Sequence, residues 1–119
     1  MQYSLIIYQT KEQFADRNDS ARREANGAAF MQYIGAMQQA GILVTTLGIE
    51  PPATAATIRA TSGTPHTTQG PYAEAKEQIG GLCVIDVPDH DTALAWAKRA
   101  PFDHCGAIEV RPTRVVSAA

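Results

Sequence analysis

Residues 80–101 read GGLCVIDVPDHDTALAWAKRAP, and this stretch decides the fold. The glycine pair opens a strand over Leu82–Val87, and Pro88 ends it because proline has no N–H to donate to a strand ladder. Asp89 predicts the N-cap of a helix over His90–Ala100, since its carboxylate can accept bonds from the first unpaired N–H groups of the helix. The stretch therefore predicts one strand and one helix joined by a turn.

The N-terminal part of the chain predicts a second strand and a second helix. The apolar run Tyr3–Tyr8 is rich in β-forming residues and predicts a strand. Residues Gln9–Gly27 are polar and charged and lack a sustained apolar face, so they predict a solvated connector with at most a short helical turn or, because long loops are often functional, a lid. Within Ala28–Ala40 the apolar residues recur at i, i+3, i+4 and i+7, which predicts one face of a helix. Gly41 suits the left-handed residue that follows such a helix.

Shorter segments complete the predicted elements. Ile42–Ile49 and Ala55–Ala60 predict strands. Thr64–Gln69 is expected to pair with the second of these, as an edge strand, because it contains a proline. Tyr72–Gln78 is charged and predicts an irregular segment or a single helical turn, and a last strand is expected over Ala107–Val110.

The order of these elements predicts an α+β fold, a ferredoxin-like plait with both helices on one face of a mostly antiparallel sheet. Both faces of the strands Tyr3–Tyr8 and Leu82–Val87 are largely apolar. A sheet with one face open to water should carry polar residues on that face. We therefore expect a second copy of the chain to cover the open face in a homodimer. The alternative is a long loop folded over that face.

Length and composition limit the class of protein. The 119 residues suit a single domain, and 45% hydrophobic with 18% charged residues is ordinary globular material. A net charge of −2 and one basic pair, Arg22-Arg23, argue against nucleic-acid binding. No apolar run approaches the roughly 20 residues of a membrane span, and the first residues do not form a cationic leader. We therefore expect no membrane association and a cytoplasmic location. Cys83 and Cys105 form no CxxC motif and are expected to be free thiols, a disulfide between them being the alternative.

Residues 69–81 read QGPYAEAKEQIGG. This stretch resembles the DGPFAETKEQLGG signature of the DGPF branch of the YCII-related family. The likeness continues in the N-terminal strand, in CVIDVPDHDTALAWAKRAP over residues 83–101, and in the closing IEVRP. The resemblance implies a ferredoxin-like, dimeric α/β barrel. It implies less about function: some members are associated with sigma factors, and some distant relatives resemble dehydrochlorinases for which a His-Asp pair is proposed as catalytic.

Three departures from this signature change the chemistry of a side chain. Gln69 replaces the aspartate, Tyr72 the phenylalanine and Ala75 the threonine. Gln69 cannot serve as a carboxylate base or as a strong cation ligand. Neither the N-terminal strand nor the helix predicted over Ala28–Ala40 contains a histidine, so the His-Asp pair has no position here that a motif identifies.

Candidate chemistry gathers in the signature segment. The candidate catalytic residues are charged groups suited to general acid–base work: Glu74, Lys76 and Glu77. The candidate ligand-binding residues are the polar Gln69, the phenol of Tyr72 and the guanidinium of Arg59, which can bind an anion as a fork. The alternative interpretation is a solvated, salt-bridged turn.

The histidines, His66, His90 and His104, are scattered and lack the spacing of metal ligands, so we expect neither a metal nor another cofactor. Two functional hypotheses remain. The first is an enzyme that performs metal-free acid–base chemistry, lyase- or isomerase-like, on a small polar or anionic molecule. The second is a non-catalytic dimeric binding or regulatory module associated with transcription.

Overall fold

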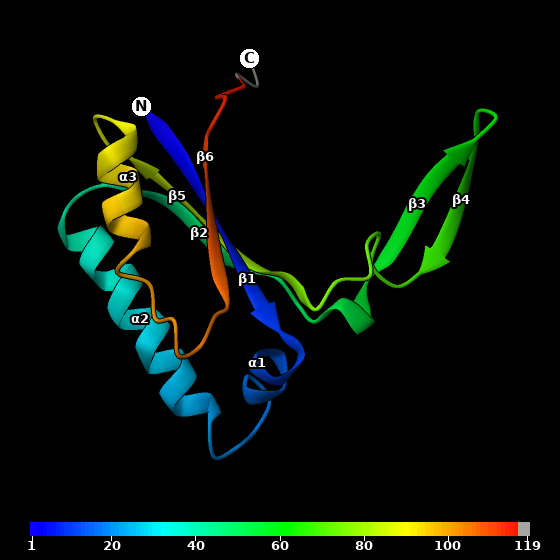
Figure 1. The fold of residues 1–119 in the computed structure, drawn as a ribbon, viewed down its shortest axis with the longest axis horizontal. Helices are drawn as coiled ribbons and strands as arrows, with labels where there is room; N and C mark the ends of the chain where they lie inside the picture. The colour runs from blue at the N-terminus through cyan, green and yellow to red at the C-terminus, as the bar shows by residue number, and fades with distance from the viewer. Residues whose placement is uncertain (117–119) are drawn as a thin grey trace.

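The computed structural model describes residues 1–116 and is built around an antiparallel sheet of four strands (Figure 1). These strands are β1 (Gln2–Thr10), β2 (Leu43–Gly48), β5 (Glu77–Asp86) and β6 (Ala107–Pro112), in the spatial order β2-β5-β1-β6. Each neighbouring pair is antiparallel. A helix connects β1 to β2 and another connects β5 to β6, which is the connectivity of a ferredoxin-like plait. The prediction of an α+β fold with an antiparallel sheet is confirmed.

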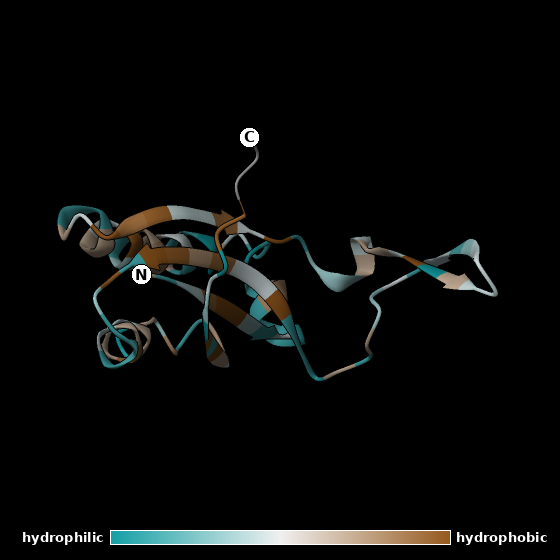
Figure 2. Ribbon diagram, turned by 90° about the horizontal axis from the view of Figure 1, so that it is seen from above, coloured by the Kyte–Doolittle hydropathy of each residue, from teal (hydrophilic) through white to brown (hydrophobic). Residues whose placement is uncertain are grey.

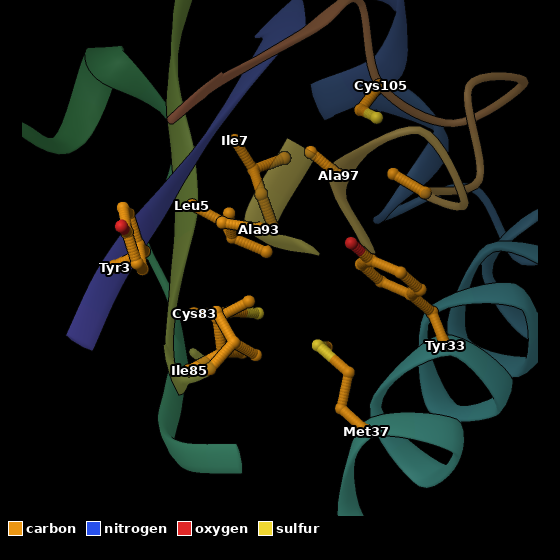
Figure 3. Packing of buried hydrophobic residues seen from close by; sticks show 12 residues of the cluster. Tyr3, Leu5, Ile7, Tyr33, Met37, Cys83, Ile85, Ala93, Ala97 and Cys105 are labelled. Atoms are coloured by element: carbon orange, nitrogen blue, oxygen red, sulfur yellow. The ribbon is translucent and has the colours of Figure 1, made fainter. Parts of the chain in front are cut away.

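Two helices cover one face of this sheet and enclose the core. They are α2 (Arg23–Gln39) and α3 (His90–Ala97). Their buried side chains meet the alternate residues of β1 and β5 that point to the same side, and Figure 3 shows Tyr33 and Met37 of α2 directed at this layer. The central residues of the cluster are Tyr3, Leu5, Ile7, Tyr33, Met37, Cys83, Ile85, Ala93 and Ala97. The faces predicted for both central strands are therefore confirmed.

The polar segment Gln9–Gly27 contains a short helix and the start of a longer one. Gln9 and Thr10 end β1, and a short helix, α1 (Lys11–Asp16), follows at once. Thr10 and Gln13 form a reciprocal capping box, which satisfies two N–H groups at the start of α1. Helix α2 then begins at Arg23 rather than at Ala28. The short helical turn expected in this segment is present as α1, which local capping stabilises, whereas the start predicted for the second helix was wrong.

Other element boundaries differ in smaller ways. Strand β5 begins at Glu77 and passes through the glycine pair that was predicted to precede it, while α3 ends at Ala97 rather than Ala100. Asp89 caps α3, accepting a 2.8 Å bond from the Thr92 N–H. Gly41 has the predicted left-handed conformation, with φ of +72°.

The segment between β2 and β5 leaves the body of the protein. A 3-10 turn, η1 (Pro52–Thr54), precedes a hairpin made of β3 (Ala56–Thr61) and β4 (Thr64–Gln69). The predicted pairing of these strands is confirmed, but they form a separate two-stranded sheet rather than an edge of the main one. Figures 1 and 2 both show the hairpin projecting beyond the end of the main sheet. The radius of gyration is 16.0 Å, whereas a compact chain of this length has about 13.5 Å.

The second face of the main sheet carries no helix. Its central residues are Ile6 of β1 and Leu82 and Val84 of β5, which lie opposite or diagonal to one another in the strand register. Figure 2 shows apolar stretches along the strands of this sheet. Towards β6 the face becomes polar, where Arg111 and Glu109 form an ion pair of 3.1 Å.

Candidate functional site

A cavity of about 360 Å³ lies between α2 and the sheet. Its walls come from β1, β2 and β5 on one side, and from α2 and Arg17, the residue that follows α1, on the other. The residues that line it are Ile7, Gln9, Arg17, Asn26, Phe30, Tyr33, Ile34, Thr46, Leu47, Gly48, Gly80, Gly81 and Cys83. The volume is in the range of small-molecule sites, which are mostly apolar with a few convergent polar groups.

Gln9 is the polar centre of this cavity. It continues the helix-facing series of β1, two residues beyond Ile7, and only 3% of its surface is exposed. Its Nε2 donates to the His104 carbonyl at 2.8 Å, and its Oε1 accepts from Arg17 Nη1 at 3.2 Å. The opposite strand makes room for this side chain with Gly80, which the β1–β5 register skips as a bulge. A Cβ at Gly80 would overlap the Gln9 amide oxygen.

Arg17 brings a positive charge to the same wall. Its Nη1 also donates to the Ile49 carbonyl at 2.8 Å, and the guanidinium carbon lies 5.4 Å from the centre of the Phe14 ring. Its Nη2 lies against Gly48, where a Cβ would come within 3.3 Å. The residue is half-buried, and within residues 1–116 no carboxylate lies within 4.0 Å of it. Arg17 therefore has donors left over and no neighbouring anion.

Asn26 is the second buried polar residue of the site, with 7% of its surface exposed. It lies in the first turns of α2, four residues before Phe30, so it extends the stripe that Tyr33 and Met37 continue. Its Nδ2 lies 3.5 Å from His104 Nδ1, which lets the amide donate to the ring nitrogen in one tautomer. His104 comes from the loop after α3 and so contacts this cluster through both its ring and its backbone.

The remaining polar groups of the cavity are poor proton carriers. Tyr33 donates to the Trp96 carbonyl at 2.8 Å, and burial raises the pKa of its phenol far above the usual value. Burial also raises the pKa of the Cys83 thiol, whose sulfur lies 3.3 Å from Thr46 Oγ1. Both cysteines are buried free thiols, as predicted. A neutral, buried thiol is a weak nucleophile, so these cysteines serve packing.

A second, larger hollow of about 890 Å³ lies between α1, the proline turn after β2 and the signature segment. It is lined by Gln9, Lys11, Phe14, Ala15, Asn18, Pro51, Pro52, Ala53, Pro71, Glu74, Ala75, Lys76 and Gln78. Gln9 thus forms part of the wall of both hollows. The signature segment is held in place by Gln78, whose Nε2 donates to the Ala73 and Ala75 carbonyls at 2.7 and 3.2 Å.

The structure divides the predicted site residues into separate groups. Glu74 and Lys76 line the larger hollow. Glu77, the first residue of β5, lies outside both hollows, with its carboxylate against Gly106. The other three belong to the hairpin and its base: the Arg59 guanidinium lies 5.2 Å from the centre of the Tyr72 ring, and Gln69 pairs with Ala56 at the start of the hairpin.

A model of the YCII-related domain matches residues 1–117, which is nearly the whole chain. The chain belongs to the YCII-related family. One curated relative, an uncharacterized protein of Rhizobium meliloti (strain 1021), is 37% identical over 76 residues, which cover 62% of this chain and 61% of that protein. The match thus spans less than two thirds of the relative's length.

Among solved structures, this YCII-related chain is similar in fold to the 5-chloro-2-hydroxyhydroquinone dehydrochlorinase of Burkholderia phenoliruptrix AC1100, in its complex with 2,5-dihydroxybenzoquinone. The TM-score is 0.54 at 14% sequence identity, with 96% of this chain and 94% of the other covered. At that identity the likeness concerns the fold alone.

Over residues 1–116, no three His, Cys, Asp or Glu side chains come together in a way that could hold a metal ion. In the same part of the chain, none of the helices is long and apolar enough to span a membrane.

Sequence reasoning missed the cluster of Gln9, Arg17, Asn26 and His104. Three of these residues fall in the segment that was predicted to be a connector, and the fourth lies in a loop far along the chain. One signal was present: Asn26 precedes Phe30 by four residues and Tyr33 by seven, so it occupies the buried face if the helix starts early.

Proposed function

We propose that this YCII-related protein is an enzyme that binds a small anionic molecule in the cavity between α2 and the sheet and performs acid–base chemistry of the lyase or isomerase kind. The observation that carries the proposal is Arg17: a half-buried guanidinium on the cavity wall, without a carboxylate within 4.0 Å among the described residues.

The physical argument concerns the cost of such a charge. Removing a cation from water is unfavourable unless it is paired, and buried charges are usually paired or hydrogen-bonded. Arg17 uses Nη1 for two oxygen atoms of the protein, at 2.8 and 3.2 Å. Its other nitrogens are left for a ligand, and guanidinium groups hold carboxylates or other planar anions by paired hydrogen bonds.

The dimensions of the cavity limit the ligand to a small molecule. A dry cavity of ~150 Å³ holds a benzene molecule, so the 360 Å³ available here suits one substituted ring or an open-chain acid of similar size. Ile7, Phe30 and Ile34 supply apolar contacts for such a ring. Gln9 and Asn26 supply amides that can orient its polar substituents.

The proton transfer is assigned to the signature segment. Tyr33 and Cys83 hold their protons too tightly at neutral pH. Glu74 and Lys76 line the adjoining hollow, which shares Gln9 with the cavity, and we propose a carboxylate base and an ammonium acid at these positions. Glu77, Gln69, Tyr72 and Arg59 stay candidate residues for binding at the outer end of the segment.

The test is a binding titration with a defined anion. The probe is 2,5-dihydroxybenzoquinone, an acidic planar ring that the similar dehydrochlorinase binds in its crystal structure, and benzoate serves as a second probe. We expect Arg17→Gln to weaken binding at least tenfold by calorimetry, because the guanidinium is the cationic partner. Arg23→Gln removes the same charge from an exposed position on α2 and should leave affinity within twofold. Equal binding by Arg17→Gln, or no binding of either anion to the unchanged protein, would disprove the cavity proposal.

The finer classification belongs to this proposal too. We place the chain in the DGPF branch of the family, on its signature segment, and in the cytoplasm. We propose a homodimer in which two copies face each other through the outer side of the main sheet, forming a dimeric α/β barrel. Support comes from Ile6, Leu82 and Val84, which give that side an apolar centre without a covering helix.

A further inference from the structure

The hairpin of β3 and β4 has two chemically different faces. Side chains alternate along each strand, and cross-strand partners share a face. One face carries Ala56, Ile58, Ala60, Pro65, Thr67 and Gln69. The other carries Thr57, Arg59, Thr61, Thr64, His66 and Thr68. The first face is mainly apolar, yet it is open to solvent, and Ile58 at its centre is 69% exposed.

Nothing in the body of the protein supports this hairpin. The two strands pair with each other and make no substantial contacts with the helices or with the main sheet. An isolated two-stranded hairpin is at best marginally stable in water. A hairpin that presents an apolar face to solvent therefore requires a further surface to pack against.

The base of the hairpin restricts the direction in which the hairpin projects from the body of the protein. Prolines occupy both connecting segments, at Pro51-Pro52 and at Pro71, and restrict the backbone there. The Gly70 N–H donates to the Ala55 carbonyl at 2.8 Å, and Thr57 Oγ1 donates to the Gly70 carbonyl at 2.7 Å. A rigid base lowers the conformational entropy lost on binding, which favours a hairpin that docks as a preformed arm.

The composition of the arm indicates which kind of partner it fits. Between Ala56 and Gln69 the cationic or titratable side chains are Arg59 and His66. Phosphate backbones and anionic lipid surfaces are recognised by clusters of Lys and Arg. The tip, Thr61–Thr64, is polar and lacks the large apolar residues that enter a bilayer. The apolar face thus fits a protein surface.

We propose that the arm packs on a second copy of this chain and that the two copies exchange arms. The outer face of the main sheet, with strands six to ten residues long and ~4.8 Å apart, projects roughly 500 Å². A stable dimer buries ~800 Å² on each partner, so the sheet face alone is too small. The reciprocal arms supply the missing area, and a twofold axis lets each copy cover the partner's open surface while its own is covered. This inference rests on the proposed homodimer and adds the arm as a necessary part of it.

Sedimentation of the full-length protein and two matched variants tests the proposal. Ile58→Asp puts a charge on the apolar face of the arm, and Thr68→Asp puts the same charge on the opposite face. We expect the unchanged protein and Thr68→Asp to dimerise with dissociation constants within about threefold of each other. Ile58→Asp should raise the dissociation constant at least tenfold. Its far-ultraviolet circular dichroism and its affinity for the cavity probe should match the unchanged protein, because the arm makes no substantial contacts with the helices or with the main sheet.

The possible results of this experiment distinguish the proposed arm contact from the proposed sheet-face dimer. A dimer that Ile58→Asp leaves unchanged would refute the arm while leaving the sheet-face dimer intact. A stable monomer of the unchanged protein at tens of micromolar would refute both. Neither result bears on Arg17, since binding of the probe anion is measured independently of association. An equal loss of dimer in Thr68→Asp would show that any added charge on the arm disrupts it, and would overturn the assignment of the apolar face.

Discussion

Replacing Gln9 by glutamate changes the cavity electrostatically with almost no change of shape. Gln9 now links three segments: its Nε2 donates to the His104 carbonyl at 2.8 Å, and its Oε1 accepts from Arg17 at 3.2 Å. In Gln9→Glu the donor becomes an oxygen that faces the His104 carbonyl. The other oxygen remains beside Arg17, where it forms a charge-assisted bond.

The two effects on stability nearly cancel. Losing the bond to His104 costs ~1–3 kcal/mol, and a hydrogen bond between charged groups contributes ~1.5–3 kcal/mol. We therefore expect the free energy of unfolding in urea to change by less than about 2 kcal/mol. Anion binding behaves differently, because the new carboxylate neutralises Arg17. Two unit charges 4 Å apart interact by ~1 kcal/mol in water and ~4 kcal/mol at an effective dielectric constant near 20. The affinity for an anionic probe should therefore fall by tenfold or more.

Calorimetric titration with 2,5-dihydroxybenzoquinone, beside urea denaturation of the same samples, checks this prediction. Gln32→Glu adds an equal charge at an exposed position of α2 and is the control for net charge. The reasoning is refuted if Gln9→Glu binds the anion as tightly as Gln32→Glu while remaining folded. In that case Arg17 does not face the ligand, or the ligand is not held by charge.

Two further predictions concern packing and pH. Gly80→Ala should lower the free energy of unfolding by ~1–3 kcal/mol in urea denaturation, because the new methyl group overlaps the Gln9 amide. Gly35→Ala, in α2 with open space around it, should instead be neutral or stabilising by up to ~1 kcal/mol. Burial, reinforced by the Glu77 carboxylate, raises the pKa of the Cys105 thiol from 9.0 to about 11. The folded state therefore keeps a proton that the unfolded chain releases, so the contribution of Cys105 to stability should be constant below pH 9 and be lost as the pH rises to 11, with a shallower decrease of the total stability in Cys105→Ala.

The main sheet and its two covering helices could be predicted from the sequence because their signals are local. The alternation of Tyr3, Leu5 and Ile7 and the cap at Asp89 each specify one element without information from elsewhere. The direction of the hairpin could not be predicted in the same way. Its strands pair as expected, but whether they join the main sheet depends on the proline-restricted segments at its base and on the surface against which it packs.

The candidate site was harder to predict, because its residues come from distant parts of the chain. Glu74 and Lys76 were identified from their motif and do line a hollow. Arg17 and His104 carry no motif, and they meet only because α1 turns back along the sheet and the loop after α3 passes the end of β1. The charged composition of Gln9–Gly27 indicated solvent exposure, whereas capping and burial of a few polar groups place part of it inside.

The cluster around Gln9 can nevertheless be recognised, because its residues depart from the local preferences of strands and helices. Gln9 is a polar residue at an inward position of an apolar strand, and Asn26 is one at an inward position of a helix. Gly80 interrupts β5 although glycine weakens strands. Each of these residues is unfavourable at its position when considered alone. Together they are compatible, because the absence of a side chain at Gly80 leaves space for the Gln9 amide, and this amide accepts a hydrogen bond from Arg17. Natural sequences break local preferences mainly where function requires it. A core built for stability alone would place apolar side chains at these positions. The combined cost of three exceptions around Arg17, which has no carboxylate within 4.0 Å among residues 1–116, favours a ligand site over a structural cluster.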